Sequence, residues 1–219
     1  MAAMSLYPEV EALVANYPDL RSVAAEAQHA CDLLIHCFQS GGKLLACGNG
    51  GSAADCEHLV GELMKSYLGP RPLPAAQQAA LLAGAADGAY LARHLQAALP
   101  AIALVSQVGL LTAVANDMGA DLVFAQQVQG YGRPGDVLVA ISTSGNSRNV
   151  LLAAQTARAL GVSTLGVTGR GGALRGVCDV TICVPQDKTA VIQERHLAFY
   201  HALCAVVERV SFGPNERSE

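Results

Sequence analysis

Residues 135–161 read GDVLVAISTSGNSRNVLLAAQTARALG and join three elements in one continuous segment. The apolar run at 135–142 follows a glycine and predicts a buried β-strand. A loop rich in serine and glycine comes next, at 142–147. Residues 149–160 have the apolar spacing of an α-helix, which Gly161 ends. A strand, a short loop and a helix in this order are typical of α/β proteins, so this stretch predicts the class of the fold.

The same alternation of apolar runs and helical segments continues along the chain. Five strands are expected, at 43–47, 100–105, 135–142, 163–169 and 179–185. Helices are expected on both sides of Pro18, within 8–40, and at 52–67, 106–117, 121–130, 149–160, 171–177 and 190–211. Strands that alternate with helices form a parallel sheet with helices on both faces. We therefore expect a single α/β domain over residues 1–219.

One segment interrupts this alternation. Residues 69–100 begin with closely spaced prolines and continue as an alanine-rich sequence of helical character. We interpret about 70–99 as a helical insertion that acts as a lid or as an oligomer contact. The polar C-terminal stretch, about 212–219, is expected to be disordered.

The composition narrows the classes of partner. Hydrophobic residues make up 52% of the chain and charged residues 15%, with a net charge of −4. This suits an α/β protein with buried strands, or a subunit that buries much of its surface in an oligomer. The lack of a basic run argues against nucleic acid, and the lack of a long apolar stretch argues against a membrane span. Acidic residues stand where a signal peptide has basic ones, so a cytoplasmic protein is expected.

The cysteines follow no metal-binding spacing. There are seven, without a CxxC pair, and most lie in apolar surroundings. Buried free thiols are therefore expected, and disulfides are improbable in a reducing compartment.

Two loops follow expected strands, GNGGS at 48–52 and STSGNS at 142–147. Ligands of open parallel sheets bind at the carboxyl ends of the strands, where both loops must lie. The second loop offers four hydroxyl groups, from Ser142, Thr143, Ser144 and Ser147. It precedes a helix N-terminus, which attracts anions, and no lysine follows as in a nucleoside-triphosphate loop. We predict that STSGNS binds a phosphate monoester; the alternative is that it is a solvent-exposed turn. GNGGS is a weaker signal of ligand binding, because it lacks the GxGxxG spacing.

Two helices carry candidate metal or acid–base groups. His58 and Glu62 are four residues apart, so they share a helix face and can hold one cation or act as an acid–base pair. A plain surface pair is the alternative. On the last helix, Gln193 and His196 share a face, whereas Gln193 and His201 are about 12 Å apart along the axis. Spacing alone therefore favours His196 as the partner of Gln193, and packing in a core or interface is the alternative for both histidines.

Taken in order, the motifs resemble a known family. They are GNGGS–x5–H–x3–E, AND at 115–117, ISTSGNS at 141–147 and Q–E–x–H–x4–H from residue 193. ISTSGNS is similar to the sugar isomerase (SIS) domain, and the added His and Glu resemble the sedoheptulose 7-phosphate (phosphoheptose) isomerase family. The resemblance implies a flavodoxin-like, three-layer α-β-α sandwich with a central parallel sheet. It also implies a homotetramer with active sites at subunit interfaces.

The resemblance assigns roles to individual residues. It implies four zinc ligands: His58, Glu62, Gln193 and His201. Glu62 and His201 also match the family's base and acid, so the family favours His201 over His196. The resemblance implies that the substrate is bound by Asn49, Gly50, Ser52, Asp117, Ser142, Thr143, Ser144, Ser147 and Gln193.

The implied reaction converts sedoheptulose 7-phosphate to D-glycero-D-manno-heptose 7-phosphate through an enediol, at the start of heptose precursor synthesis. Three departures from the family pattern leave the substrate open: Ala190 replaces an aspartate, Ser66 replaces an arginine, and the 70–99 insertion is added. The alternatives are an isomerase of another sugar phosphate, or a non-catalytic SIS module that binds sugar phosphates or associates with a replication initiator.

Overall fold

A computed structural model describes residues 6–213 and contains one five-stranded sheet. The strand order is β2-β1-β3-β4-β5, and every neighbouring pair is parallel. The strands are β1 (Leu44–Gly48), β2 (Ala101–Ala103), β3 (Val137–Ser142), β4 (Ser163–Thr168) and β5 (Val180–Cys183). This is the order of flavodoxin-like sheets, so the predicted fold class is confirmed.

The apolar runs lie where the sheet is covered on both faces. Every residue of β1 and β3 is buried, and the two strands pair in register from Leu44 opposite Val137 to Gly48 opposite Ile141. Strands covered on both faces need apolar side chains at every position, which explains why these runs do not alternate. β2 is shorter than the predicted 100–105 because it lies at the sheet edge and the chain turns after Ala103.

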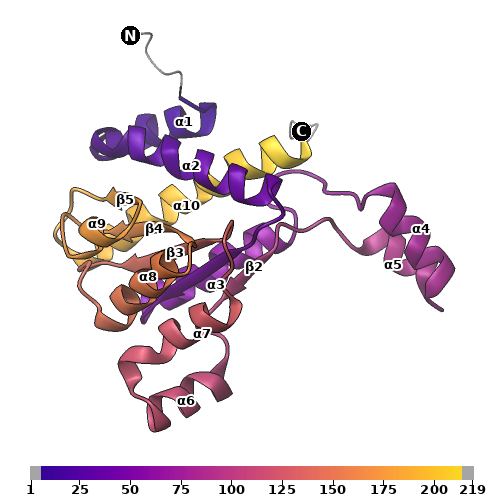
Figure 1. Cartoon of the computed structure of the whole chain (residues 1–219). Helices are drawn as coiled ribbons and strands as arrows, with labels where there is room; N and C mark the ends of the chain where they lie inside the picture. Colours follow the sequence, from indigo (N-terminus) through magenta and orange to yellow (C-terminus); the bar gives the residue numbers. More distant parts are fainter. Residues whose placement is uncertain (1–5, 214–219) are drawn as a thin grey trace.

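Helices cover both faces of the sheet, which makes three layers (Figure 1). One face is covered by α1 (Pro8–Asn16), α2 (Ala24–Gln39), α3 (Gly51–Met64) and α10 (Thr189–Phe212). The other is covered by α6 (Val108–Asp117), α7 (Val123–Tyr131), α8 (Arg148–Ala159) and α9 (Leu174–Val177). Pro18 opens the 3₁₀ segment η1 (Pro18–Val23), and a second 3₁₀ segment, η2 (Ala120–Leu122), precedes α7. The predicted helices are therefore confirmed.

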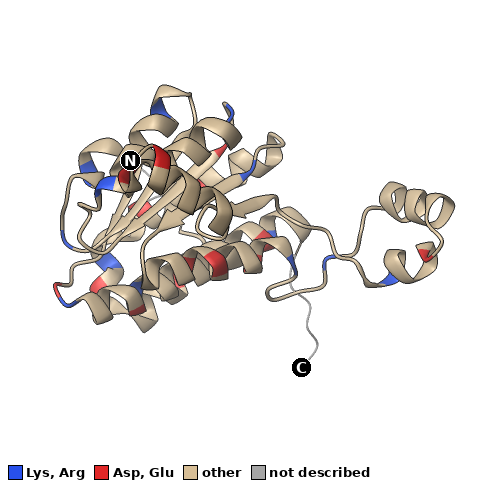
Figure 2. Cartoon of the chain, turned by 90° about the horizontal axis from the view of Figure 1, so that it is seen from below, with Lys and Arg blue, Asp and Glu red and all other residues tan. Residues whose placement is uncertain are grey.

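Between α3 and β2, a helical hairpin projects away from the sheet (Figure 1). It consists of α4 (Ala75–Gly84) and α5 (Gly88–His94), and we call residues 75–94 the arm. No residue of α4 is buried, and Gly88 alone is buried in α5. The arm is almost free of charged residues (Figure 2). An antiparallel bridge between Pro72 and Gln96 joins the two chain segments at its base.

The C-terminal end of the chain differs from the expectation. Helix α10 continues to Phe212, which was expected to belong to a disordered tail, because Phe212 packs against the core. Residues 214–219 of that tail lie outside the described residues. Within residues 6–213, no helix combines the length and the apolar character needed to cross a membrane.

Candidate active site

The sheet order places both ligand loops side by side. From β1 the chain moves outward to β2 on one side, and then returns to β3 on the other side of β1. At such a switch point the loops after the two central strands diverge and leave a crevice for ligands. The side chains of Asn49 and Asn149 connect the two sides of this crevice by exchanging two hydrogen bonds, each 2.9 Å from Nδ2 to Oδ1. The loops GNGGS and STSGNS therefore face one another as predicted from their positions after the strands.

In the STSGNS loop, three serine hydroxyls converge. Ser142 Oγ lies 3.0 Å from Ser147 Oγ and 3.4 Å from Ser144 Oγ. Gly145, with φ +67°, allows the turn, because a Cβ there would clash with the carbonyl oxygen of Gly171. The loop leads directly into the N-terminus of α8, whose first amides have no partner within the helix. Neutral donors beside a helix N-terminus can bind a phosphate group.

The GNGGS loop contributes backbone and one asparagine to the crevice. Gly50 has φ +56°, and Ser52 is buried at the start of α3. A Cβ on Gly51 would clash with the amide of Gln193, so α10 approaches this loop as closely as glycine permits. A cleft of about 360 Å³ opens beside the loop, lined by Gly48, Asn49, Gly50, Leu111, Thr112 and Phe124 among others. Asp117 is exposed at the end of α6, where its carboxylate accepts a hydrogen bond from Asn116.

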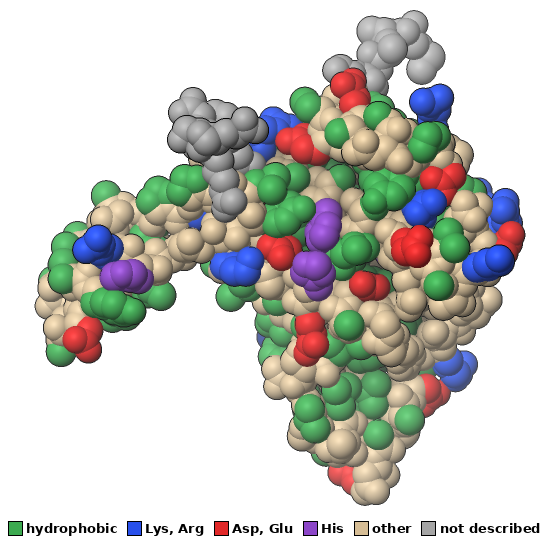
Figure 3. All heavy atoms as spheres, turned by 180° about the vertical axis from the view of Figure 1, so that it is seen from behind, with side chains coloured by type: hydrophobic (Ala, Val, Ile, Leu, Met, Phe, Trp, Pro, Cys, Tyr) green, Lys and Arg blue, Asp and Glu red, His purple; other side chains and the backbone are tan. Residues whose placement is uncertain are grey.

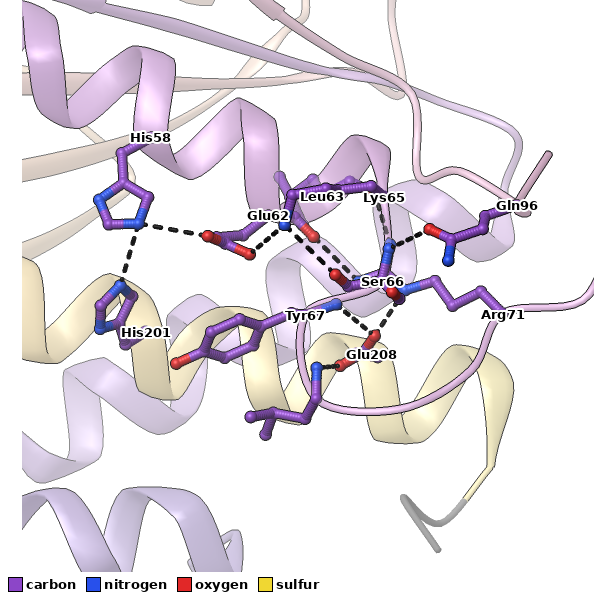
Figure 4. A network of polar contacts seen from close by, with 11 residues as sticks. His58, Glu62, Leu63, Lys65, Ser66, Tyr67, Arg71, Gln96, His201 and Glu208 are labelled. Atoms are coloured by element: carbon purple, nitrogen blue, oxygen red, sulfur yellow. Dashed lines mark hydrogen bonds and ion pairs between the residues drawn. The ribbon is translucent and has the colours of Figure 1, made fainter. Parts of the chain in front are cut away.

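A second cluster forms where α3 crosses α10. His58 Nε2 lies 3.2 Å from Glu62 Oε1 and 3.4 Å from His201 Nε2 (Figure 4). The other carboxylate oxygen of Glu62 lies 3.1 Å from Lys65 Nζ. Burial and the neighbouring His58 lower the pKa of His201, while Glu62 opposes this shift. The neutral imidazole is thereby favoured, with a lone pair available to accept a proton or a cation.

This cluster lies on the surface of the molecule. Histidine side chains gather at the centre of one face, among acidic and hydrophobic side chains (Figure 3). A groove of about 300 Å³ opens beside His201, lined in part by Tyr17, Tyr67 and Ala198. Two imidazoles and a carboxylate at a groove can serve as zinc ligands or as an acid–base pair.

The other candidate ligands of α10 lie elsewhere. Gln193 stands against Gly51, about two helical turns from His201. His196 is fully buried, and neither of its ring nitrogens has a hydrogen-bond partner in the described structure. Burial lowers the pKa of His196 to about 4. Within residues 6–213, no three His, Cys, Asp or Glu side chains are already arranged to hold a metal ion. The structure brings His58 into contact with Glu62 and His201, although not in a preformed metal geometry, and places Gln193 against Gly51.

Four residues near the cluster were not singled out in the sequence. Asp55 precedes His58 by three residues, so its place on the same helix face could have been recognised. Tyr200 contacts His58 from α10, and no sequence pattern signals that contact. Arg71 and Glu208 form a buried ion pair beneath Glu62, although they are distant in sequence.

The sheet order and the hydroxyl loop define the class of protein, a SIS domain. The SIS-domain family model matches residues 19–96 and 78–169, two overlapping stretches. A phosphoheptose isomerase from Akkermansia muciniphila is 41% identical over 199 residues, which cover 90% of this chain and 92% of that protein. A second, from Rhodospirillum rubrum, is 44% identical over 190 residues, which cover 86% and 88%.

A solved structure agrees with these relatives. The phosphoheptose isomerase of Neisseria gonorrhoeae superimposes with a TM-score of 0.71 at 35% identity, over 90% of this chain and 93% of that one. The chain belongs to the phosphoheptose isomerase family of SIS-domain proteins. The family resemblance inferred from the motifs is therefore confirmed.

Proposed function

We propose that this protein is an aldose–ketose isomerase that converts sedoheptulose 7-phosphate to D-glycero-D-manno-heptose 7-phosphate. The observation that carries the proposal is the convergence of His58, Glu62 and His201 at the α3–α10 crossing, in a member of this family. The reaction needs a base, an acid and an anchor for the phosphate. The cluster offers the first two, and the STSGNS loop offers the third.

Each residue has a defined task in the proposed mechanism. The loop hydroxyls of Ser142, Ser144 and Ser147 hold the phosphate at the far end of the sugar chain. Glu62 takes the proton from C1, while the carbonyl oxygen at C2 gains a proton from His201, and an enediol results. Return of a proton to C2 and loss of the proton from the C1 oxygen then produce the aldehyde.

The separation of the two clusters supports a long substrate. His58 lies seven residues after Gly51 on α3, which corresponds to about 10 Å along the helix. A seven-carbon sugar phosphate has its reacting carbons at the opposite end from the phosphate. We assign Asn49, Gly50, Ser52, Asp117 and Gln193 to the part of the substrate between these ends, and Thr143 to the phosphate together with the serines of its loop.

The donor set also fits zinc. Imidazole nitrogen and carboxylate oxygen are ordinary zinc ligands, and catalytic sites use three protein ligands with an open position. We propose that His58, Glu62 and His201 hold the ion, and that Gln193 joins them only if its side chain leaves Gly51. Glu62 would release the ion before it takes the proton, because a carboxylate bound tightly to zinc is not a free base. Bound zinc would polarise the carbonyl and hydroxyl oxygens of the substrate.

The direct test is an isomerase assay of the purified protein with sedoheptulose 7-phosphate, with zinc or with a chelator. We expect turnover with zinc, loss of turnover with the chelator, and less than about a hundredth of the rate in Glu62→Gln. Glu57→Gln is the matched control, because Glu57 lies on the same helix and binds Ser106 instead. Absence of turnover with added zinc, or a near-normal rate for Glu62→Gln, contradicts the proposal.

A second candidate is isomerisation of another sugar phosphate. Ser66 stands where the family has an arginine, and its amide is held by Gln96 at the base of the arm. Lys65 Nζ lies 3.3 Å from Ser66 O and 3.1 Å from Glu62 Oε2, so this segment lies beside Glu62. Parallel assays with ketose phosphates of five, six and seven carbons decide between the candidates, since the true substrate has the highest kcat/KM.

We also propose that the active form is a homotetramer. The arm exposes large apolar side chains, including Leu82, Tyr90 and Leu95 at its base, and the chain is 52% hydrophobic. Exposed apolar patches of this kind mark association surfaces. Light scattering after size-exclusion chromatography should give four times the 22.6 kDa mass of the chain, and a monomer or dimer would contradict the proposal.

A further inference from the structure

A pair of asparagine side chains joins the two loops of the crevice. Asn49 Nδ2 donates to Asn149 Oδ1, and Asn149 Nδ2 donates to Asn49 Oδ1, each over 2.9 Å. Asn49 belongs to the GNGGS loop, and Asn149 lies in the first turn of α8, directly after STSGNS. The pair therefore connects the sugar loop to the phosphate loop across 100 residues of sequence.

A third hydrogen bond determines the orientation of the Asn149 amide group. The backbone N–H of Val150 donates to Asn149 Oδ1 over 3.0 Å. This N–H lies in the first turn of α8, where backbone N–H groups have no partner within the helix. If the side chain were rotated, the NH₂ group would face the N–H of Val150, and two donors would oppose each other. The backbone of α8 therefore fixes the oxygen of Asn149 toward Val150.

The orientation of Asn49 follows from that of Asn149. Rotation of the Asn49 amide alone would place nitrogen against nitrogen and oxygen against oxygen, and both hydrogen bonds would be lost. Within residues 6–213, neither side chain has a further hydrogen bond that would favour the opposite arrangement. All three contacts therefore agree on one orientation of the Asn49 amide.

This orientation leaves part of Asn49 free for a ligand. A side-chain amide has two N–H groups and an oxygen with two lone pairs, and the pair uses one N–H and one lone pair of Asn49. The side chain is exposed, and both asparagines line the cleft of about 360 Å³ beside GNGGS. A sugar hydroxyl can accept from the free N–H or donate to the free lone pair, whereas an ionised phosphate has no hydrogen to donate. Asn49 is therefore suited to hydroxyl groups.

We propose that Asn149 is a positioning residue that holds the amide of Asn49 with one N–H and one lone pair free for the hydroxyl groups of the substrate. Asn149 acts through Asn49 and does not itself bind the sugar. The identity of the sugar rests on the proposed function, whereas the orientation of Asn49 follows from the contacts of this chain alone.

The first test reads the orientation of Asn49 directly. Crystal structures of the parent protein and of Asn149→Ala are compared without a ligand. We expect one conformer of the Asn49 side chain in the parent, paired with Asn149, and several conformers in the variant. A single, unchanged conformer in Asn149→Ala overturns the proposal, because another contact then positions Asn49.

The second test measures binding with sedoheptulose 7-phosphate and inorganic phosphate as probes. Calorimetric titrations use the Glu62→Gln background, so that the sugar is not consumed. Asn149→Ala should weaken binding of the sugar phosphate about five- to tenfold, as expected for one or two hydrogen bonds, and change phosphate binding less than about twofold. Gln155→Ala is the matched control, because it removes an exposed amide from the same helix about 9 Å further along. It should change neither affinity.

A double variant distinguishes positioning from a general structural role. Because Asn149 acts through Asn49, Asn149→Ala should change the affinity for sedoheptulose 7-phosphate less than about twofold once Asn49→Ala is present. A further loss in the double variant contradicts the proposal. Equal weakening of both probes in Asn149→Ala also contradicts it, because Asn149 then supports the N-terminus of α8 as a whole.

These measurements separate the role of Asn149 from the proposed function. If the protein with both asparagines intact binds phosphate but not sedoheptulose 7-phosphate, the proposed substrate is wrong, and the crystal structures still decide the role of Asn149. If Asn149→Ala does not fold, Asn149→Asp supplies the structural readout, because its carboxylate accepts from Val150 but has no N–H for Asn49 Oδ1. Displacement of the Asn49 amide in that variant supports the proposal, and an undisturbed Asn49 contradicts it.

Discussion

Arg71 and Glu208 form an ion pair in the interior, with Arg71 Nε 2.6 Å from Glu208 Oε1 and side chains 0% and 1% exposed. Glu208 also accepts hydrogen bonds from the backbone amides of Tyr67 and Leu68 (Figure 4). Arg71 donates to the carbonyl oxygens of Leu63 and Glu62. The pair thereby connects α10 to the end of α3 and to the segment that leads into the arm. The hydrogen bond from Arg71 also holds the backbone carbonyl group of Glu62 in place.

Removal of Glu208 should destabilise the protein strongly. Glu208→Ala leaves the Arg71 guanidinium buried without its counter-ion, which typically costs about 3–5 kcal/mol. Urea unfolding measures the change. Asp187→Ala is the control, because Asp187 pairs with Arg170 at the surface, with side chains 77% and 62% exposed. Such exposed pairs contribute at most about 1 kcal/mol. Equal losses in the two variants would contradict the structural role of the buried pair.

The arm should be dispensable for folding of the rest of the chain. Residues 75–94 bury no large side chain, and the chain segments at the base are already joined between Pro72 and Gln96. We expect that replacing residues 73–95 by Asn-Gly preserves cooperative unfolding and changes stability by no more than about 1 kcal/mol. Circular dichroism and urea unfolding of the shortened chain provide the measurement. Loss of the cooperative transition would show that the arm supports the core.

The sheet was predictable because its strands are buried on both faces. Runs such as 137–142 have apolar side chains throughout, and glycines mark their ends. The strand order followed from the family resemblance, since five parallel strands can be ordered in several ways. The length of β2 was overestimated because an apolar residue after an edge strand has the same sequence signal as one within it.

The site was predictable only in part. The i,i+4 spacing of His58 and Glu62 and the hydroxyls of STSGNS are local signals, and the structure brings each set together. The contact of His201 with His58 spans 143 residues and depends on the crossing of α3 and α10. Local spacing favoured His196 on that helix, yet His196 faces the core and has no contact with the cluster. The packing of α3 against α10 places His201, and not His196, beside His58.

The buried His196 should make stability depend on pH. Its pKa is about 4 in the folded protein and 6.5 without the fold, so the unfolded chain binds the proton more strongly. Stability is therefore complete above about pH 6.5 and falls as the pH decreases toward 4, by up to about 3 kcal/mol. His196→Leu should remove this part of the dependence. Urea unfolding at pH 7.5 and at pH 5 measures it, and a variant with the parental slope would contradict the assignment.

The turn of the STSGNS loop should be sensitive to one added methyl group. Gly145→Ala introduces a Cβ at φ +67° that clashes with Gly171 O and crowds Thr168 Oγ1. The loop must shift, and the converging hydroxyls of Ser142 and Ser147 move with it. Loss of one or two hydrogen bonds to phosphate, each worth about 1 kcal/mol, should raise the KM for the sugar phosphate about tenfold or more.

Gly171→Ala is the matched control for this change. A Cβ on Gly171 meets no atom within 4 Å, although Gly171 forms the other side of the same contact. We expect a parental KM in this variant and unchanged circular dichroism in both. Both variants add one methyl group. A difference between their KM values therefore arises from the position of that group in the loop. A parental KM in Gly145→Ala would show that the phosphate binds outside STSGNS.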